Sequence, residues 1–138
     1  MIFLVAFLSS LLQVTPQQDL PSVKVNAVTF HVEVARSDEE WRKGLMFREK
    51  LGAHEGMLFY GKLERPQIFW MKNTLVSLDI VFISKNKKIV SIAKHTEPFS
   101  ETPIPSAGPA QYVLEILAGQ ADAAKLKPGD KVEFLPFS

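Results

Sequence analysis

Cysteine is absent from the 138-residue chain. This absence excludes disulfide bonds, thiolate metal sites, a cysteine nucleophile and a lipid-modified cysteine, but it leaves the redox compartment open. Histidine is scarce, and His31, His54 and His95 stand far apart without the spacing of metal ligands. The sequence therefore predicts no metal site and no cofactor.

An excess of charge of one sign is also missing. Sixteen basic and fifteen acidic residues give a formal net charge of +1, so the chain has no global field to attract nucleic acid or an anionic membrane surface. We expect no nucleic-acid partner. The sequence also lacks a nucleophile elbow, a zincin helix, a phosphate-binding loop and a dinucleotide fingerprint.

The N-terminal segment is nearly free of polar residues. Its first fourteen residues are apolar except for Ser9, Ser10 and Gln13, and the first charged residue is Asp19. An apolar run of this length matches the hydrophobic region of a signal peptide better than a membrane span, which needs about 20 residues. No basic residue precedes the run and no clean cleavage site follows it, so an uncleaved anchor and a buried N-terminal helix are the alternatives.

This segment sets the expected domain organisation. We expect residues 1–18 to be a signal peptide or membrane anchor, residues 19–24 a spacer, and residues 25–138 one β-rich domain, because a chain of this length supports a single core. Such a leader predicts a secreted or periplasmic protein, or one anchored to the outer face of a membrane through this segment alone. We expect a monomer.

The first regular elements have clear sequence patterns. Residues 28–35 alternate apolar and polar side chains, which predicts a half-buried antiparallel strand. The run Ser37-Asp38-Glu39-Glu40 is a capping box and predicts a short helix to about Met46. Trp41 and Leu45, four residues apart, form its apolar face.

Several further strands are expected, separated by turns: residues 56–60, 68–71, 78–83, 89–93, 112–117 and 131–135. Residues 61–67 are polar and predict a connection, and four prolines in residues 96–109 predict a long irregular loop. Residues 119–126 predict a short helical turn. About seven short strands with one or two brief helices predict a mainly β fold, a compact antiparallel barrel or sandwich.

The densest group of candidate site residues lies in residues 69–79. Trp70, Lys72, Asn73 and Thr74 combine an aromatic ring, an ammonium group, an amide and a hydroxyl, and Asp79 follows in the next strand. Large apolar side chains exclude water there, so the polar groups between them need specific partners. A core strand that enters a turn explains the same pattern.

Two acids interrupt strands that are otherwise apolar, Asp79 and Glu115. A buried carboxylate needs a partner or takes up a proton. As a functional pair, the two acids could perform acid/base chemistry or hold a hard cation. As structural groups, Asp79 accepts hydrogen bonds from turn amides and Glu115 pairs with a lysine. We favour the structural interpretation.

Six short segments, in this order and spacing, resemble the domain-of-unknown-function 192 family (uncharacterised protein family 0127): Gly44-Leu45-Met46, Gly56-Met57-Leu58-Phe59, Phe69-Trp70-Met71-Lys72-Asn73-Thr74, Leu78-Asp79-Ile80, Tyr112-Val113-Leu114-Glu115 and Gly129-Asp130. The resemblance covers about Val25 to Phe134. It implies a compact β-rich fold and an N-terminal signal or anchor, and it implies no agreed activity.

The sequence favours an extracytoplasmic, non-catalytic domain that binds an unknown small ligand or an envelope protein. Its candidate binding residues are Trp70, Lys72, Asn73, Thr74, Asp79 and Glu115. The alternative is a small hydrolase or lyase that uses the carboxylates of Asp79 and Glu115. Acids within reach of one another in an open pocket would favour the enzyme.

Overall fold

The computed structural model describes Ile2 and residues 20–136 of the chain. The expected signal peptide or anchor at residues 1–18 lies, apart from Ile2, outside the described residues. The described part contains seven strands and two short helices: β1 Ser22–Val25, β2 Val28–Ala35, α1 Asp38–Lys43, β3 Glu55–Phe69, β4 Leu78–Ile83, β5 Ile89–Ala93, β6 Ile104–Leu117, α2 Gln120–Ala123 and β7 Glu133–Leu135.

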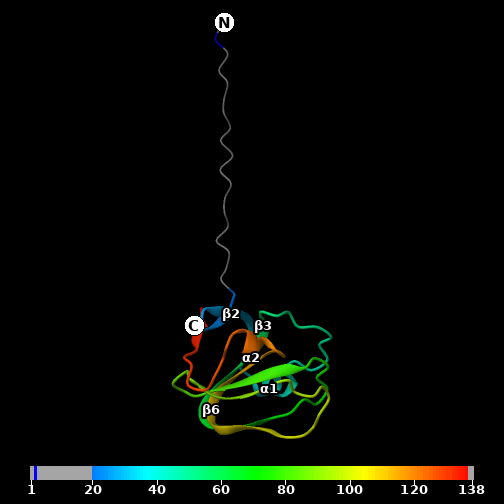
Figure 1. Ribbon diagram of the computed structural model, residues 1–138. Coiled ribbons are helices and arrows are strands. Elements are labelled where there is room, and N and C mark those ends of the chain that lie inside the picture. The colour runs from blue at the N-terminus through cyan, green and yellow to red at the C-terminus, as the bar shows by residue number, and fades with distance from the viewer. Residues whose placement is uncertain (1, 3–19, 137–138) are drawn as a thin grey trace.

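The strands form one curled sheet, a half-barrel (Figure 1). The order of the strands in the sheet is β5-β4-β6-β3-β2-β1-β7. All neighbouring strands are antiparallel except β2 and β3, which pair in parallel through the connection that carries α1. The expected mainly β fold with short helices is confirmed. The sheet is mixed because the chain crosses over between β2 and β3 instead of turning back.

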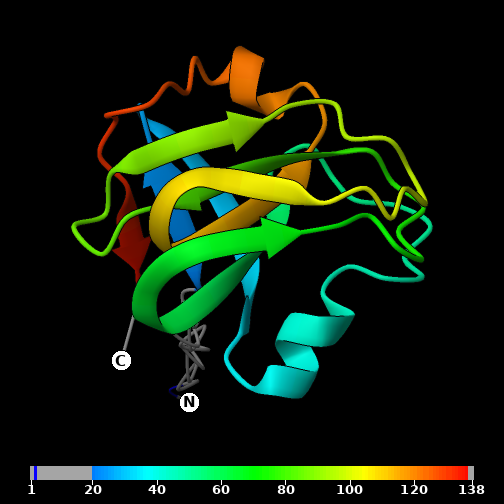
Figure 2. The ribbon, with the colours of Figure 1, turned by 90° about the horizontal axis from the view of Figure 1, so that it is seen from below.

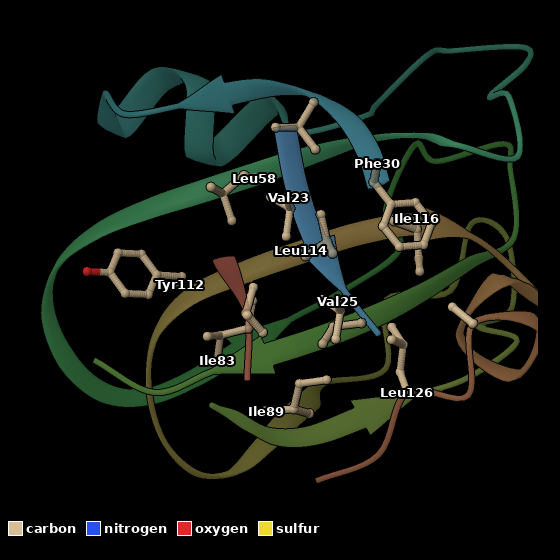
Figure 3. Packing of buried hydrophobic residues seen from close by; sticks show 14 of the residues in the cluster. Val23, Val25, Phe30, Leu58, Ile83, Ile89, Tyr112, Leu114, Ile116 and Leu126 are labelled. Atoms are coloured by element: carbon tan, nitrogen blue, oxygen red, sulfur yellow. The ribbon is translucent and has the colours of Figure 1, made fainter. Parts of the chain in front are cut away.

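Buried side chains gather on both faces of the sheet. The inner cluster takes residues from strands along the whole curl, and their side chains point toward one another (Figure 3): Val23, Val25, Phe30, Leu58, Ile83, Ile89, Tyr112, Leu114, Ile116 and Leu126. The outer cluster lies on the other face and includes Phe59, Met71, Leu78, Ile80, Phe82 and Val113, with Trp41 of α1 packed against it. Helices α1 and α2 lie on opposite sides of the sheet (Figure 2). Successive residues of β4 and β6 therefore enter different clusters.

Strand β3 is much longer than expected. Residues 61–67 are not a connection, because the strand runs without a break from Glu55 to Phe69. It pairs with β6 through two register shifts, between Tyr60 and Arg65 and between Pro66 and Ile68. The prediction of a connection was wrong because the middle of this strand is exposed to solvent, where polar side chains carry no desolvation penalty.

Strand β6 begins inside the segment expected to be an irregular loop. It starts at Ile104, and Pro109 stands opposite Pro66 of β3. A proline lacks an amide donor, so two prolines that face each other leave no backbone donor unpaired. The register shift next to this pair accommodates the missing hydrogen bonds between the two strands. The loop before β6 is therefore shorter than predicted.

The expected spacer also contains a strand. Strand β1 begins at Ser22 and pairs with both β2 and β7. A two-residue turn joins β1 to β2, and Asn26 and Ala27 both have positive φ angles there, of 49° and 65°. Such turns match the twist of hairpin strands. The folded domain therefore starts before residue 25.

The capping box forms as expected. The Glu40 amide donates to the Ser37 hydroxyl over 3.1 Å, and the Ser37 amide donates to the Glu40 carboxylate over 3.0 Å. Helix α1 then ends at Gly44, which has a φ of 49° that disfavours any side chain. This end of α1 covers the outer face of the sheet next to β6.

Candidate functional site

Asp79 is fully buried and has three backbone partners. The His95 amide donates to one carboxylate oxygen over 2.9 Å, and the amides of Gly119 and Ala121 donate to the other over 3.0 and 2.9 Å. This carboxylate ties β4 to the first turn of α2 and to the end of β5. Asp79 therefore accepts amide hydrogen bonds as expected, although not those of the turn directly before it.

Glu115 lies on the opposite face of the sheet. It pairs with Ile80 of β4, and Ile80 belongs to the outer cluster. The residue is 95% buried, since only 5% of its surface is exposed. Among the described residues, none donates a hydrogen bond to its carboxyl group and none forms an ion pair with it, so the expected lysine partner is not there. Burial raises the pKa of Glu115 from 4.5 to about 8.

The carboxyl group of Glu115 borders a hollow of about 290 Å³ in the outer face, which we call the Glu115 hollow. Its apolar walls come from α1 and the turn that follows it, from both halves of β3 and from the residue after β3: Trp41, Leu45, Met46, Phe59, Ile68, Phe69 and Trp70. Thr74 and Gln67 add a hydroxyl and an amide. An apolar cavity with a few convergent polar groups and a perturbed carboxyl group is the usual form of a small-molecule site.

Edge-to-face ring contacts fix the aromatic walls. Phe59 and Phe69 lie 5.0 Å apart between ring centroids, and Trp41 lies 5.3 Å from Phe59 and 6.1 Å from Phe69. Such pairs stabilise by about 0.5 to 1.5 kcal/mol beyond their burial. The walls are thus held by the core and need no ligand to take their positions.

Gly44 keeps the hollow open above the carboxyl group. A Cβ atom on Gly44 would lie 3.2 Å from the Cζ atom of Phe59 and 4.0 Å from the Oε2 atom of Glu115. Two features therefore favour glycine at position 44: the positive φ angle, and the lack of room for a Cβ atom beside Phe59.

Positive charge surrounds the mouth of the hollow. Arg42 and Lys43 of α1 and Arg65 of β3 line it, and all three are exposed. Arg65, Gln67 and Trp41 also line a neighbouring hollow of about 300 Å³, which is bordered by Arg36 and Lys62. The carboxyl group thus lies deep, and the basic groups lie in solvent.

The structure brings three of the six predicted site residues together. Trp70, Thr74 and Glu115 line the Glu115 hollow. Lys72 lies beside it, with its ammonium group 5.1 Å from the ring centroid of Trp70 and 3.9 Å from the Glu101 carboxylate. Asn73 holds the turn in place, because its carbonyl accepts from the Phe47 amide over 2.9 Å and its φ is 52°. Asp79 belongs to the other face.

Sequence reasoning did not include Trp41, Gly44, Phe59, Arg65 and Gln67 in the site. Trp41 and Gly44 carried a signal, because a short helix that presents a tryptophan and ends in a glycine indicates close packing against a neighbouring element. Arg65 and Gln67 carried none, since Arg65 follows the first register shift of β3 and Gln67 lies within the second, and no local pattern predicts these shifts.

Residues 20–136 contain no group of three or more histidines and acidic residues that could hold a metal ion. None of their helices has the length and apolar character needed to cross a membrane. The chemistry of the hollow therefore depends on its one buried carboxyl group, the aromatic walls and the basic mouth.

Fold and hollow together define a small half-barrel domain with a carboxyl group beneath an aromatic-walled pocket. The model of the DUF192 family (Uncharacterized ACR, COG1430) matches residues 21–134. The chain belongs to this family, as the six sequence segments suggested.

Two solved structures share the fold. A protein of unknown function from Novosphingobium aromaticivorans DSM 12444 is 42% identical, with a TM-score of 0.77 over 87% of this chain and 90% of that one. A protein from Sinorhizobium meliloti 1021, provisionally described as a transcription regulator, is 34% identical, with a TM-score of 0.78 over 83% of this chain and 91% of that one. None of the curated proteins compared with the chain matches it.

Proposed function

We propose that this protein is a non-catalytic binding domain whose Glu115 hollow takes a small ligand. The observation that carries the proposal is the carboxyl group of Glu115, which is buried, faces a pocket and has no partner among the described residues. No side-chain oxygen or nitrogen atom that is fully buried lacks a partner among the described residues, so the carboxyl oxygens of Glu115 are accessible from the hollow. A ligand in the hollow can therefore reach this carboxyl group and supply its partner.

The form of the walls supports a preformed site. Trp70 is 44% exposed at the mouth, whereas Phe59 at the inner end is buried. A gradient from an exposed tryptophan to a buried phenylalanine offers apolar contact along the whole depth of the pocket.

We place the domain outside the cytoplasm, secreted, periplasmic or anchored by residues 1–18, on the strength of the apolar N-terminal run. The description of the Sinorhizobium relative raises the regulation of transcription as the alternative. The formal charge of +1 does not favour that role, because DNA binding draws on a concentrated basic surface.

The geometry does not support the alternative of a hydrolase or lyase that uses Asp79 and Glu115 together. Asp79 and Glu115 lie on opposite faces of the sheet, so the two carboxylates cannot act on one substrate from one pocket. An enzyme would have to use Glu115 alone, without the second acid or base that such hydrolases require.

The test is an NMR titration of the isotope-labelled chain with benzylamine, benzoate and benzyl alcohol at millimolar concentration. We expect at least one probe to shift the amide signals of Gly44 and Thr74 and to be recovered unchanged. Trp70→Ala should abolish the shifts. Leu63→Ala, at an exposed position that lines only the neighbouring hollow, should preserve them. The proposal fails if no probe shifts these signals, or if Trp70→Ala leaves the shifts intact.

A further inference from the structure

We infer that the ligand of the Glu115 hollow carries a protonated amine on a small apolar group, with the ammonium against the Glu115 carboxylate and the apolar group between the aromatic walls. This inference rests on the proposed binding function and names the chemical class of its ligand.

The first argument is the carboxyl group itself. Its carboxylate form lacks a counter-charge, because no described residue pairs with it and the basic side chains of the hollow are exposed at its mouth. An ammonium group supplies both the missing charge and up to three hydrogen-bond donors. A hydroxyl group supplies one donor and no charge, and a second carboxylate would add repulsion.

The second argument is the surface above the carboxyl group. Trp41, Phe59 and Phe69 line the hollow and contact one another edge to face. A cation is attracted to the face of an aromatic ring, and the attraction is stronger where water is excluded. Aromatic walls over a buried acid therefore favour an organic cation over an inorganic one, since the organic cation also fills the apolar space.

The third argument is size and the surrounding charge. A volume of about 290 Å³ suits a ligand with one ring or a short chain. The charged groups that line the same hollow are Arg42 and Lys43 from α1 and Arg65 from β3, while Leu78 and Ile80 of β4 on this face carry no charge. These three cations repel a second ammonium group on the ligand and attract a carboxylate or another acidic group. The hollow should prefer a monoamine, or an amine with an acid at its outer end, over a diamine.

Binding of an amine at Glu115 should be coupled to the release of a proton from its carboxyl group. With a pKa of about 8, Glu115 is protonated at pH 7 in the free protein. When the ammonium group enters, the carboxyl group loses its proton to the buffer and the carboxylate pairs with the cation. The apparent affinity for an amine should rise by up to about tenfold per pH unit until the pH reaches the pKa of Glu115.

The test compares three ligands of the same shape by isothermal titration calorimetry on the full chain: 2-phenylethylamine, 2-phenylethanol and 3-phenylpropionate. At pH 7 we expect the amine to bind at least about tenfold more tightly than the other two. Titration in buffers of different ionisation enthalpy should show the release of close to one proton per amine bound.

Two variants complete the test. Glu115→Gln should weaken amine binding by at least about tenfold and abolish proton release, while 2-phenylethanol binds as before. Glu133→Gln, at an exposed position on β7, is the matched control and should behave as the parent. If the alcohol or the acid binds as tightly as the amine, or if amine binding releases no proton, the inference is wrong and the hollow remains a binding site for another class. If none of the three ligands binds, the proposed function fails as well.

Discussion

Asp79 and Glu115 stand one register position apart on the paired strands β4 and β6, yet their carboxyl groups lie on opposite faces of the sheet. Asp79 is paired with Ile116, which belongs to the inner cluster, and Glu115 is paired with Ile80, which belongs to the outer cluster. Paired residues share a face and successive residues alternate. The two acids therefore have separate roles, one in holding α2 and one in the hollow.

The first prediction concerns Asp79→Asn. Both carboxylate oxygens accept backbone amides, three in all, so the amide group of asparagine must direct its own donor toward at least one of them. We expect the free energy of unfolding to fall by about 3 kcal/mol. Asp122→Asn is the control and should change stability far less, because its ion pair with Lys94 is exposed to solvent. Urea denaturation measures both, and an Asp79→Asn variant as stable as the parent would contradict the assigned role.

The second prediction uses pH and the variant Glu115→Gln. Because the pKa of Glu115 is raised from 4.5 to about 8, the folded protein keeps a proton in this pH range that the unfolded chain has lost. Glu115 therefore lowers stability by up to about 1.4 kcal/mol per pH unit as the pH rises from 4.5 to 8. Glu115→Gln should match the parent near pH 4.5 and exceed it by several kcal/mol near pH 8.5. Parallel stability curves for the two proteins would show that the carboxyl group is solvated or paired.

The third prediction compares two glycines with positive φ angles. Gly44→Ala and Gly129→Ala should each destabilise the fold by about 1 kcal/mol or more, because alanine disfavours φ angles of 49° and 93°. Only Gly44→Ala places a methyl group against Phe59, whereas Gly129 has nothing within 4 Å. Calorimetry with 2-phenylethylamine should therefore show weaker binding to the Gly44→Ala variant alone. Equal binding by both variants would mean that the hollow extends away from Gly44.

The fourth prediction concerns the cap of α1, which carries Trp41 to the wall of the hollow. Ser37→Ala removes the hydroxyl that accepts from the Glu40 amide and should cost about 1 kcal/mol in denaturant unfolding. Ser37→Thr keeps an oxygen at this position and should cost much less. If the alanine variant unfolds at the same denaturant concentration as the parent, with the same slope, the cap does not contribute to stability.

Patterns that depend on local chemistry were predictable from the sequence. The alternation in residues 28–35 gave the bounds of β2, and the Ser37 capping box gave the start of α1, because strand periodicity and helix caps are set by neighbouring residues. Glu115 was recognisable as unusual because a charged residue within an apolar strand needs an explanation.

Features that depend on pairing between distant residues were not predictable in the same way. The exposed middle of β3 resembles a loop, and only its pairing with β6 identifies it as strand. The partners of Asp79 come from residues 95, 119 and 121, which no local pattern connects to position 79. The Glu115 hollow likewise joins α1, β3, β6 and the turn at Thr74, so its shape follows from the crossover between β2 and β3.

The pKa of Glu115 tests the central claim most directly, and the chemical shift of its carboxyl carbon reports it as a function of pH. In the free protein we predict a single titration with a midpoint near 8, because the group is buried and unpartnered. With saturating 2-phenylethylamine the midpoint should fall by at least about one pH unit, since the bound ammonium stabilises the carboxylate. A midpoint near 4.5 in the free protein, or a midpoint that the amine leaves unchanged, would contradict the assignment of this carboxyl group as the centre of a ligand site.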